Sequence, residues 1–295
     1  MKKIILCCAV IALLAGFCSC ASSPASSQSG SSVWKVSKDG NSLFLGGSIH
    51  ILRSGDFPLP KEFDRAFSQS SMLVLEADIE QLADENIAQY LVTRMILPDG
   101  KTLVSILVSD TYEMLKEKCE EYGIPIDSVS QLKPSMIMTI LTMLEIQKSG
   151  FVQQGVDIYY FNKAKKVKKP RGFLETIEAQ IDMLVTMGDG YENDYVKYSL
   201  YDMDSMENEF TDIVSEWRKG GASSTEKAIL EMKSQWPVLY KTMLADRNAA
   251  WLPHINEYLA AGSPVLVIVG LAHLHGPDGL LKQLAESGCT VEQFR

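Results

Sequence analysis

The sequence predicts an α/β fold with a mixed central sheet, an N-terminal hairpin and large helical insertions. Short apolar runs typical of strands occur near both ends of the chain, and long helical patterns fill the region between them. The clearest strand, VLVIVG at residues 265–270, is apolar or glycine at every position and therefore looks buried. His and Glu residues stand just past several of these runs, which predicts a strand-end His/Glu site.

The N-terminal hairpin is predicted from apolar residues on either side of a turn. Val33 to Val36 form the first expected strand, and the sequence Asp-Gly-Asn supplies the turn. Leu43 to Leu45 form the second strand, which ends at a pair of glycines. A short hairpin of this kind needs further elements to cover it, and the rest of the chain provides them.

Helical periodicity dominates the middle of the chain. Apolar residues three and four apart, capping residues and terminal glycines predict the helices, whereas shorter apolar runs predict the remaining strands. The expected strands are 72–78, 169–176 and 289–294. The expected helices are 58–70, 109–123, 133–150, 155–167, most of 177–261 with breaks near 187–193 and 218–224, and 276–288.

Residues 1–20 have the pattern of a secretory signal. Two lysines precede an apolar stretch from Ile4 to Phe17, and small residues then lead to Cys20. The stretch is shorter than the roughly 20 residues that a spanning helix needs, although a short uncleaved membrane anchor is the alternative interpretation. Phe17 and Ser19 precede Cys20 much as in a lipoprotein box. Residues 1–20 therefore predict a lipoprotein signal peptide, with lipidation at Cys20.

The next segment, residues 21–32, is rich in serine and carries no charge, which is typical of a flexible linker. Residues 33–295 remain for one folded domain, which is long enough to bury a sizeable core. We therefore expect an exported lipoprotein of the cell envelope that is anchored to a membrane through its lipid.

Charge and cysteine content exclude several classes of partner and site. The formal net charge of −9 argues against nucleic acid as a partner. The one basic run, Lys163 to Arg171, favours a solvated helix end over contact with anionic head groups, because an apparent buried strand follows it. Past the signal only Cys119 and Cys289 remain, which excludes cysteine-rich zinc sites and favours two free buried thiols over a single bridge.

Two predicted strands end in the same motif, a glycine followed by two residues and a histidine. The first copy, GSIH, ends at His50, and the second, GLAH, ends at His273. A glycine at a strand end permits a tight turn that residues with a Cβ resist. Ligands bind at the carboxyl edge of open α/β sheets, so both histidines are expected at one rim if their strands share a sheet.

Glu76 and Glu175 close two other predicted strands, so four strand ends carry His, Glu, Glu and His. Two imidazoles with one or two carboxylates are a normal ligand set for a divalent transition metal such as Zn²⁺, Mn²⁺, Fe²⁺ or Co²⁺. The pattern predicts a metal bound by His50, His273 and Glu76, with Glu76 or Glu175 as a catalytic carboxylate. It leaves open which glutamate is the ligand and which is the general base.

Each of these residues also has a structural interpretation. A lone histidine at a strand end is often structural, and a glutamate there often caps the next helix. Of the two other histidines, His254 lies in a helical pattern and is predicted to be structural. His275 is expected to cap or border the segment GPDGLL.

The segment LADRNAAW contributes a cation late in a long helical region. An exposed salt bridge from Arg247 to Asp246 or Glu257 is one interpretation. The functional interpretation places Arg247 at the wall of the site, where a guanidinium can hold a carboxylate or a developing oxyanion. Arg247 is therefore the third predicted catalytic residue, beside Glu76 and Glu175.

Six motifs occur in order along nearly the whole mature chain: LGGSIHIL, LVLEAD, LPDGKTL, GVDIYYFNKAKKVKKPRGFLETIEAQ, LADRNAAW and VGLAHLHGPDGLL. With them the chain resembles the TraB/GumN family (TraB/PrgY/GumN), which is related to the Tiki metalloproteases. The resemblance implies an α/β core with inserted helices. It also implies a site formed by His50, Glu76, Glu175, Arg247 and His273, and, for Tiki-like relatives, metal-dependent cleavage of peptides.

The expected function is a metal-dependent hydrolase, most simply a peptidase, that acts on a peptide or small-molecule substrate. The alternative is a non-catalytic lipoprotein that binds a peptide, haem or a partner protein in the same cleft, with His50 or His273 as an axial haem ligand. The sequence contains neither H-E-x-x-H nor G-x-S-x-G, so zincin and serine-hydrolase chemistry are not indicated.

Overall fold

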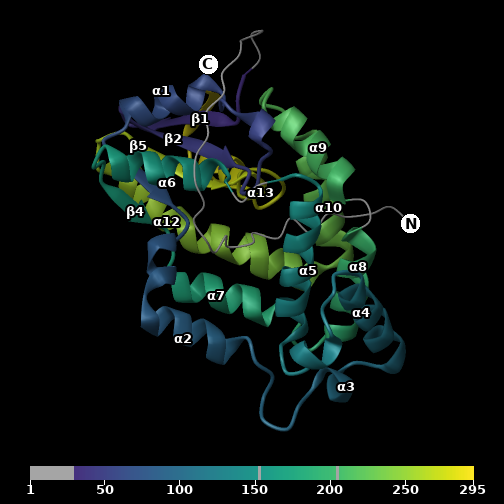
Figure 1. Ribbon diagram of the computed structural model, residues 1–295. Coiled ribbons are helices and arrows are strands. Elements are labelled where there is room, and N and C mark those ends of the chain that lie inside the picture. Colours follow the sequence, from purple (N-terminus) through teal and green to yellow (C-terminus); the bar gives the residue numbers. More distant parts are fainter. Residues whose placement is uncertain (1–29, 152–153, 204–205) are drawn as a thin grey trace. The chain divides into compact units, whose positions relative to one another are not determined.

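A computed structural model describes residues 30–151, 154–203 and 206–295 (Figure 1). The predicted signal peptide with Cys20, and residues 21–29 of the predicted linker, lie outside the described residues. The described chain divides into two compact units. The sheet unit comprises residues 30–77, 151–175 and 210–295, and the helical unit comprises residues 78–150 and 176–209.

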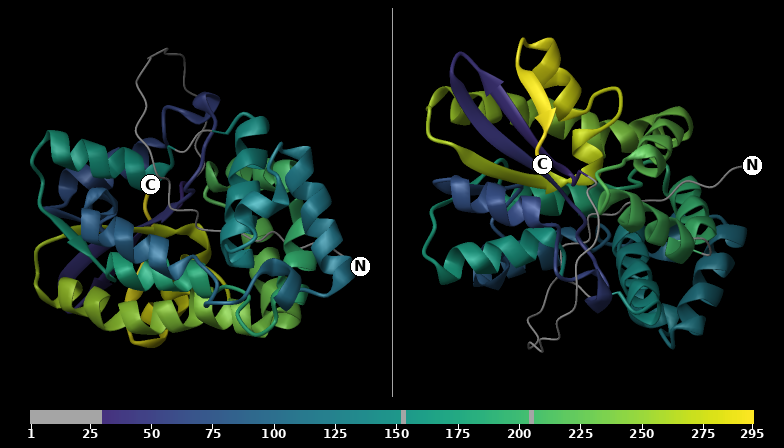
Figure 2. Two further views of the ribbon diagram at one scale, coloured as in Figure 1. Left: turned by 60° about the horizontal axis from the view of Figure 1, so that its bottom comes forward. Right: turned by 90° about the horizontal axis from the view of Figure 1, so that it is seen from above.

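The sheet unit contains a six-stranded mixed sheet in the order β4-β3-β5-β2-β1-β6 (Figures 1 and 2). Four neighbouring strands, β4, β3, β5 and β2, run parallel, whereas β1 pairs antiparallel with both β2 and β6. The α/β class and the N-terminal hairpin predicted from the sequence are confirmed. The strands are β1 Val33–Lys38, β2 Asn41–Ser48, β3 Met72–Leu75, β4 Arg171–Phe173, β5 Val265–Gly270 and β6 Thr290–Gln293.

Helices of the sheet unit cover both faces of the sheet. On one face the apolar residues of α12 and α14 pack against alternate residues of β5, among them Val265, Val267 and Val269. On the other face Phe63 of α1 lies against Gly46 and Ile268. A strand that is covered on both faces has no polar position, which explains the apolar sequence of β5.

The remaining elements of the sheet unit connect and surround these layers. They are the 3-10 turn Ser54–Asp56, α1 Lys61–Gln69, α6 Val156–Lys166, α10 Ser223–Gln235, α11 Pro237–Tyr240, the π-helical turn Lys241–Ala245, α12 Asp246–Ala260, α13 Leu271–Leu274 and α14 Leu280–Glu286. Helix α9, Met206–Trp217, spans the boundary between the units at residue 210.

The helical unit forms its own core and holds none of the predicted site residues. Its α5 and α7 are joined by a hydrogen bond from Ser135 Oγ to the Val185 carbonyl at 3.0 Å. Asp182 of α7 accepts a hydrogen bond from Tyr90 of α2 at 2.8 Å. The helices are α2 Glu85–Arg94, α3 Leu103–Ile106, α4 Ser109–Glu121, α5 Pro134–Lys148, α7 Ile177–Thr186 and α8 Glu192–Met203, with 3-10 turns Ile79–Ala83 and Ile126–Val129.

Several predicted boundaries differ from the observed ones. The helix predicted from residue 276 begins at Leu280, because Gly276 has a φ of +84° and residues before Gly279 form a turn. Strands β3 and β4 are shorter than predicted, so Glu76 and Glu175 lie just past them. Cys119 and Cys289 are both free and buried. Among the described residues no helix has the length and apolar composition to cross a membrane.

Candidate functional site

The site residues lie where four parallel strands end. Ser48 of β2 pairs with Gly270 of β5, and Leu75 of β3 pairs with Phe173 of β4. Because neighbouring parallel strands end at one edge of the sheet, the residues that follow them must meet there. The four residues placed at this edge are His50, Glu76, Glu175 and His273.

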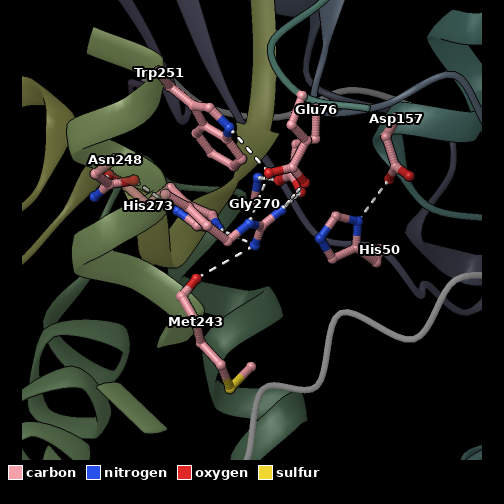
Figure 3. A network of polar contacts seen from close by, with 10 residues as sticks. His50, Glu76, Asp157, Met243, Asn248, Trp251, Gly270 and His273 are labelled. Carbon is pink, nitrogen blue, oxygen red and sulfur yellow. Dashed lines mark hydrogen bonds and ion pairs between the residues drawn. The ribbon is translucent and has the colours of Figure 1, made fainter. Parts of the chain in front are cut away.

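Gly270 marks the point around which three of these side chains converge (Figure 3). A Cβ at Gly270 would lie 3.1 Å from Nε2 of His50, 3.4 Å from Oε1 of Glu76 and 3.5 Å from Cδ2 of His273. The two imidazole rings are therefore well within the roughly 10 Å beyond which a shared ion is excluded. The absence of a side chain at Gly270 keeps this space open.

Arg247 lies at the centre of the site. It follows the π-helical turn Lys241–Ala245 in the first turn of α12, and such turns often occur at functional positions. Its five N–H groups meet five acceptors: Nε and Nη2 donate to Glu175 at 3.1 and 2.6 Å, Nη2 donates to Glu76 at 2.7 Å, and Nη1 donates to Met243 O and His273 Nε2 at 3.3 and 2.9 Å. No exposed salt bridge forms at this position, since the side chain is buried.

The two glutamates share Arg247 but differ in their other contacts. Oε1 of Glu76 also accepts the backbone N–H of Gly270 at 2.7 Å. Burial opposes the charge of Glu76, but Arg247 and the nearby histidines lower its pKa to about 2. Glu175 accepts a further hydrogen bond from Nε1 of Trp251 at 3.1 Å, yet burial raises its pKa above the usual range despite Arg247. Glu175 is thus the better proton acceptor of the two near neutral pH.

His273 is buried, with 4% of its surface exposed, and is held on both ring nitrogens. Nδ1 lies 2.7 Å from Oδ1 of Asn248, and Nε2 accepts from Arg247. Its ring also packs on Trp251, with ring centroids 4.4 Å apart. Burial and the charge of Arg247 lower the pKa of His273 to about 3, so the ring is neutral.

His50 has a different environment at the neighbouring strand end. Its side chain is 25% exposed, and Nδ1 lies 3.2 Å from Oδ1 of Asp157. Burial lowers the pKa of His50, but the charge and hydrogen bond of Asp157 and the charge of Glu76 outweigh it and raise the pKa to about 9. In the absence of a metal, His50 is therefore an imidazolium near neutral pH.

Helix α6 delivers Asp157 to this position through a close backbone contact. Val156 N–H donates to the Ile49 carbonyl at 3.1 Å, and Ser48 Oγ donates to Asp157 Oδ1 at 2.7 Å. A Cβ on Gly155 would fall 2.3 Å from the Ile49 oxygen, so only glycine permits the start of α6 to lie against the His50 loop.

The sequence predicted five of the residues at this site, but the prediction did not include Asp157 or Asn248. Both lie in motifs already singled out, GVDIYY and DRNAAW. An aspartate in the first turn of a predicted helix that begins at a glycine was one available signal, and an amide next to a candidate arginine was another. Neither signal says which histidine the side chain contacts.

The two remaining histidines lie away from these contacts. His254 is exposed on α12, and its Nδ1 is 3.4 Å from Glu257. His275 lies beside the turn at Gly276, with Nδ1 3.4 Å from Glu226 and its ring edge against Trp34. His275 thus borders the GPDGLL segment, in the place the sequence indicated.

Comparison with known families adds independent information. Residues 32–293 match the model of the TraB/PrgY/gumN family. The chain belongs to the TraB/PrgY/gumN family. No solved structure matches the chain.

This family member also shows distant similarity to the metalloprotease TIKI1. It is 27% identical to TIKI1 of Xenopus tropicalis over 182 residues, which cover 52% of this chain and 34% of the relative. It is 26% identical to TIKI1 of Homo sapiens over 193 residues, covering 56% of this chain and 37% of the relative. The chain spans only about a third of the length of these relatives.

The donor atoms around Gly270 bear on metal binding, because the matched relatives are named metalloproteases. Both histidines have Nδ1 against a side-chain oxygen, which is usual for metal-binding histidines. Nε2 of His50 faces the space at Gly270, whereas Nε2 of His273 faces Arg247 and its neighbour Cδ2 borders that space. Glu76 supplies a carboxylate between them. The donor set therefore fits a divalent transition metal.

One contact opposes simultaneous binding by all three predicted ligands. Nε2 of His273 has one lone pair, and Nη1 of Arg247 uses it. Within the part of the chain that the structure describes, no three His, Cys, Asp or Glu side chains are spaced to bind one ion. Arg247 was expected at the wall of the site, but it lies between the ligands and must release His273 before that ring can bind an ion.

Proposed function

We propose that this chain is a metal-dependent hydrolase of the peptidase class. The observation that carries the proposal is the convergence of His50, Glu76 and His273 around Gly270. The distant similarity of this chain to TIKI1 metalloproteases supports the same chemistry. The substrate is a peptide or a small molecule, and the donor set suits Zn²⁺, Mn²⁺, Fe²⁺ or Co²⁺.

In this proposal His50, His273 and Glu76 bind the metal. The bound metal would polarise the substrate carbonyl and lower the pKa of a water molecule. Glu175 would accept the proton of that water, since burial raises its pKa above that of an exposed glutamate. Trp251 and Arg247 hold the Glu175 carboxylate in one orientation for this step.

Arg247 would act after it releases His273. Its Nη1 group, freed from the ring, is positioned to donate to an oxyanion, while Nη2 and Nε stay on the two glutamates. A guanidinium that remains bound to both carboxylates also limits their mutual repulsion. Arg247 thus serves as both a structural cation and a candidate donor to the transition state.

The proposal includes export and lipid anchoring through Cys20. The basis is the sequence of residues 1–20 alone, since these residues lie outside the described structure. Labelled fatty acid should be incorporated into the wild-type chain and lost in Cys20→Ser. Incorporation that persists in Cys20→Ser would contradict the assignment of the anchor.

Metal analysis of protein purified without an affinity tag is the direct test of the hydrolase proposal. About one equivalent of a transition metal is expected in the wild type, with strong loss in His50→Ala and His273→Ala. His254→Ala is the matched control, because that ring is exposed and lies away from the site. Peptide hydrolysis should disappear on chelation and return when the metal is restored.

Other outcomes would favour the alternative function. A stoichiometric haem absorption band that is lost in His50→Ala or His273→Ala, without bound transition metal, would favour the non-catalytic binding protein. Metal content that is equal in the wild type and both site variants would contradict the proposed ligands.

A further inference from the structure

Each site histidine contacts a side-chain oxygen that comes from a helix outside its own Gly-x-x-His motif (Figure 3). Asp157 of α6 places Oδ1 3.2 Å from Nδ1 of His50. Asn248 of α12 places Oδ1 2.7 Å from Nδ1 of His273. The hydrolysis proposed above gives neither Asp157 nor Asn248 a role, yet both contacts join Nδ1 of a site histidine to a side-chain oxygen.

The amide of Asn248 can adopt only one orientation. Its Nδ2 group lies 3.1 Å from the His273 carbonyl and 2.7 Å from the Asp278 carbonyl, and both carbonyls only accept. The NH₂ group must therefore face these carbonyls, and Oδ1 must face the imidazole. Since Oδ1 only accepts, Nδ1 of His273 must carry the proton.

The same reasoning applies to His50. The carboxylate of Asp157 only accepts, so Nδ1 of His50 must carry a proton to form the hydrogen bond. Ser48 donates to the same carboxylate oxygen and fixes its position. The contact of Gly155 with the His50 backbone places α6 so that Asp157 reaches the ring from one side.

We propose that Asp157 and Asn248 are a pair of positioning residues, which hold the proton on Nδ1 of His50 and His273 and so leave Nε2 of each ring as the acceptor atom that faces the site. Nε2 of His50 lies 3.1 Å from the Cβ position of Gly270, and Nε2 of His273 faces Arg247. This role rests on the proposed function in one respect: Nε2 serves as a ligand atom only if the site binds a metal.

The tautomers can be read in the metal-free protein, independently of any activity. The chain has four histidines, so long-range ¹H–¹⁵N spectra of ¹⁵N-histidine-labelled protein contain four rings, which single His→Gln variants assign. The Nδ1–H tautomer is expected for His273 at neutral pH, and for His50 above its pKa of about 9. An Nε2–H tautomer of the neutral His273 ring, or of His50 above pH 9 where that ring is neutral, would overturn the inference.

Paired variants separate positioning from structural support. Asn248→Leu removes the acceptor, so an Nε2–H population should appear at His273. Asn248→Asp keeps an acceptor at Nδ1 but loses both donations to backbone carbonyls, so the proton should stay on Nδ1 even if stability falls. Asp157→Asn can turn an NH₂ group toward His50 and should shift that ring toward Nε2–H. The control Gly55→Ala, whose added Cβ has nothing within 4 Å, should leave the tautomer unchanged. Unchanged tautomers in Asn248→Leu and Asp157→Asn would overturn the inference.

Binding of Co²⁺ provides a second readout. Loss of a partner that orients a ligand typically weakens metal binding by about 10–100-fold, and this range is expected for Asp157→Asn and Asn248→Leu. Gly55→Ala should bind Co²⁺ nearly as the wild type does. If the tautomers are as expected but the wild type binds no Co²⁺, the proposed function fails and the positioning role stands. If wild-type affinity persists in both variants, the positioning role is refuted and the hydrolase remains.

Discussion

The two Gly-x-x-His segments end neighbouring parallel strands, but their histidines have different surroundings. His50 is a quarter exposed and contacts the carboxylate of Asp157, whereas His273 is buried and contacts the neutral amide of Asn248 and the cation Arg247. Their pKa values are displaced in opposite directions, to about 9 and about 3. The same motif thus yields two different groups, because the helices that pack against each strand end supply different partners.

Loss of Arg247 should have the largest effect on stability, and it should change the pKa of His273 more than that of His50. Arg247→Met leaves Glu76 and Glu175 buried without their cation, and uncompensated buried charges typically cost about 3–5 kcal/mol. The pKa of His273 should rise only part of the way toward its usual range, since burial still lowers it. The pKa of His50, which contacts Asp157 instead, should change less. Urea unfolding would measure the stability, and NMR titration would measure the pKa values of the two histidines. A stability loss below about 1 kcal/mol would show that the guanidinium does not compensate the glutamates.

Filling the space between the two histidines should have the next largest effect. A Cβ at Gly270 would lie 3.1 Å from Nε2 of His50, which is tighter than an ordinary contact, and would touch Glu76 and His273. Overpacking of this kind typically costs about 1–3 kcal/mol. Gly270→Ala is therefore expected to reduce both stability and metal binding. Gly55→Ala is the matched control, because nothing lies within 4 Å of that Cβ position. Equal metal binding by the two variants would contradict the shared space.

The opposite pKa shifts predict opposite pH dependence in the metal-free protein. The pKa of His50 rises from 6.5 to about 9 on folding, so its contribution is fully present below pH 6.5 and is lost as the pH rises through 9. The pKa of His273 falls to about 3, so its contribution is present above pH 6.5 and is lost as the pH falls through 3.

Asp157→Asn should remove the alkaline change and leave the acidic one. The expected alkaline fall in Tm of the wild type is on the order of 5 °C, which thermal melts at successive pH values would measure. A wild-type alkaline slope that persists in Asp157→Asn would mean that Asp157 does not hold the charge of His50.

The smallest effect is expected at the exposed histidine of α12. His254→Gln removes only a surface contact with Glu257, and such pairs contribute little to stability. Its unfolding free energy should match that of the wild type within about 0.5 kcal/mol. Its metal content should equal that of the wild type within experimental error. A marked loss of stability or of bound metal in His254→Gln would show that such effects are not specific to the histidines at the strand ends.

Sequence patterns predicted the parts of the fold that depend on neighbouring residues. The apolar run of β5, the hairpin turn and the helical spacing of α4 and α5 are local signals, and the structure contains those elements. The predicted boundaries were less accurate. The segment before Leu280 was expected to be helical, although its glycines favour a turn.

The sequence by itself determined that His50, Glu76, Glu175 and His273 follow strand ends, since strand patterns and glycines are visible in the chain. Only the tertiary structure decided what each residue contacts. Arg247 and Glu76 are 171 positions apart, and Ser48 and Asp157 are 109 apart. Charge, tautomer and pKa depend on the oxygen or nitrogen within about 3 Å, and helices that pack across the sheet provide those atoms.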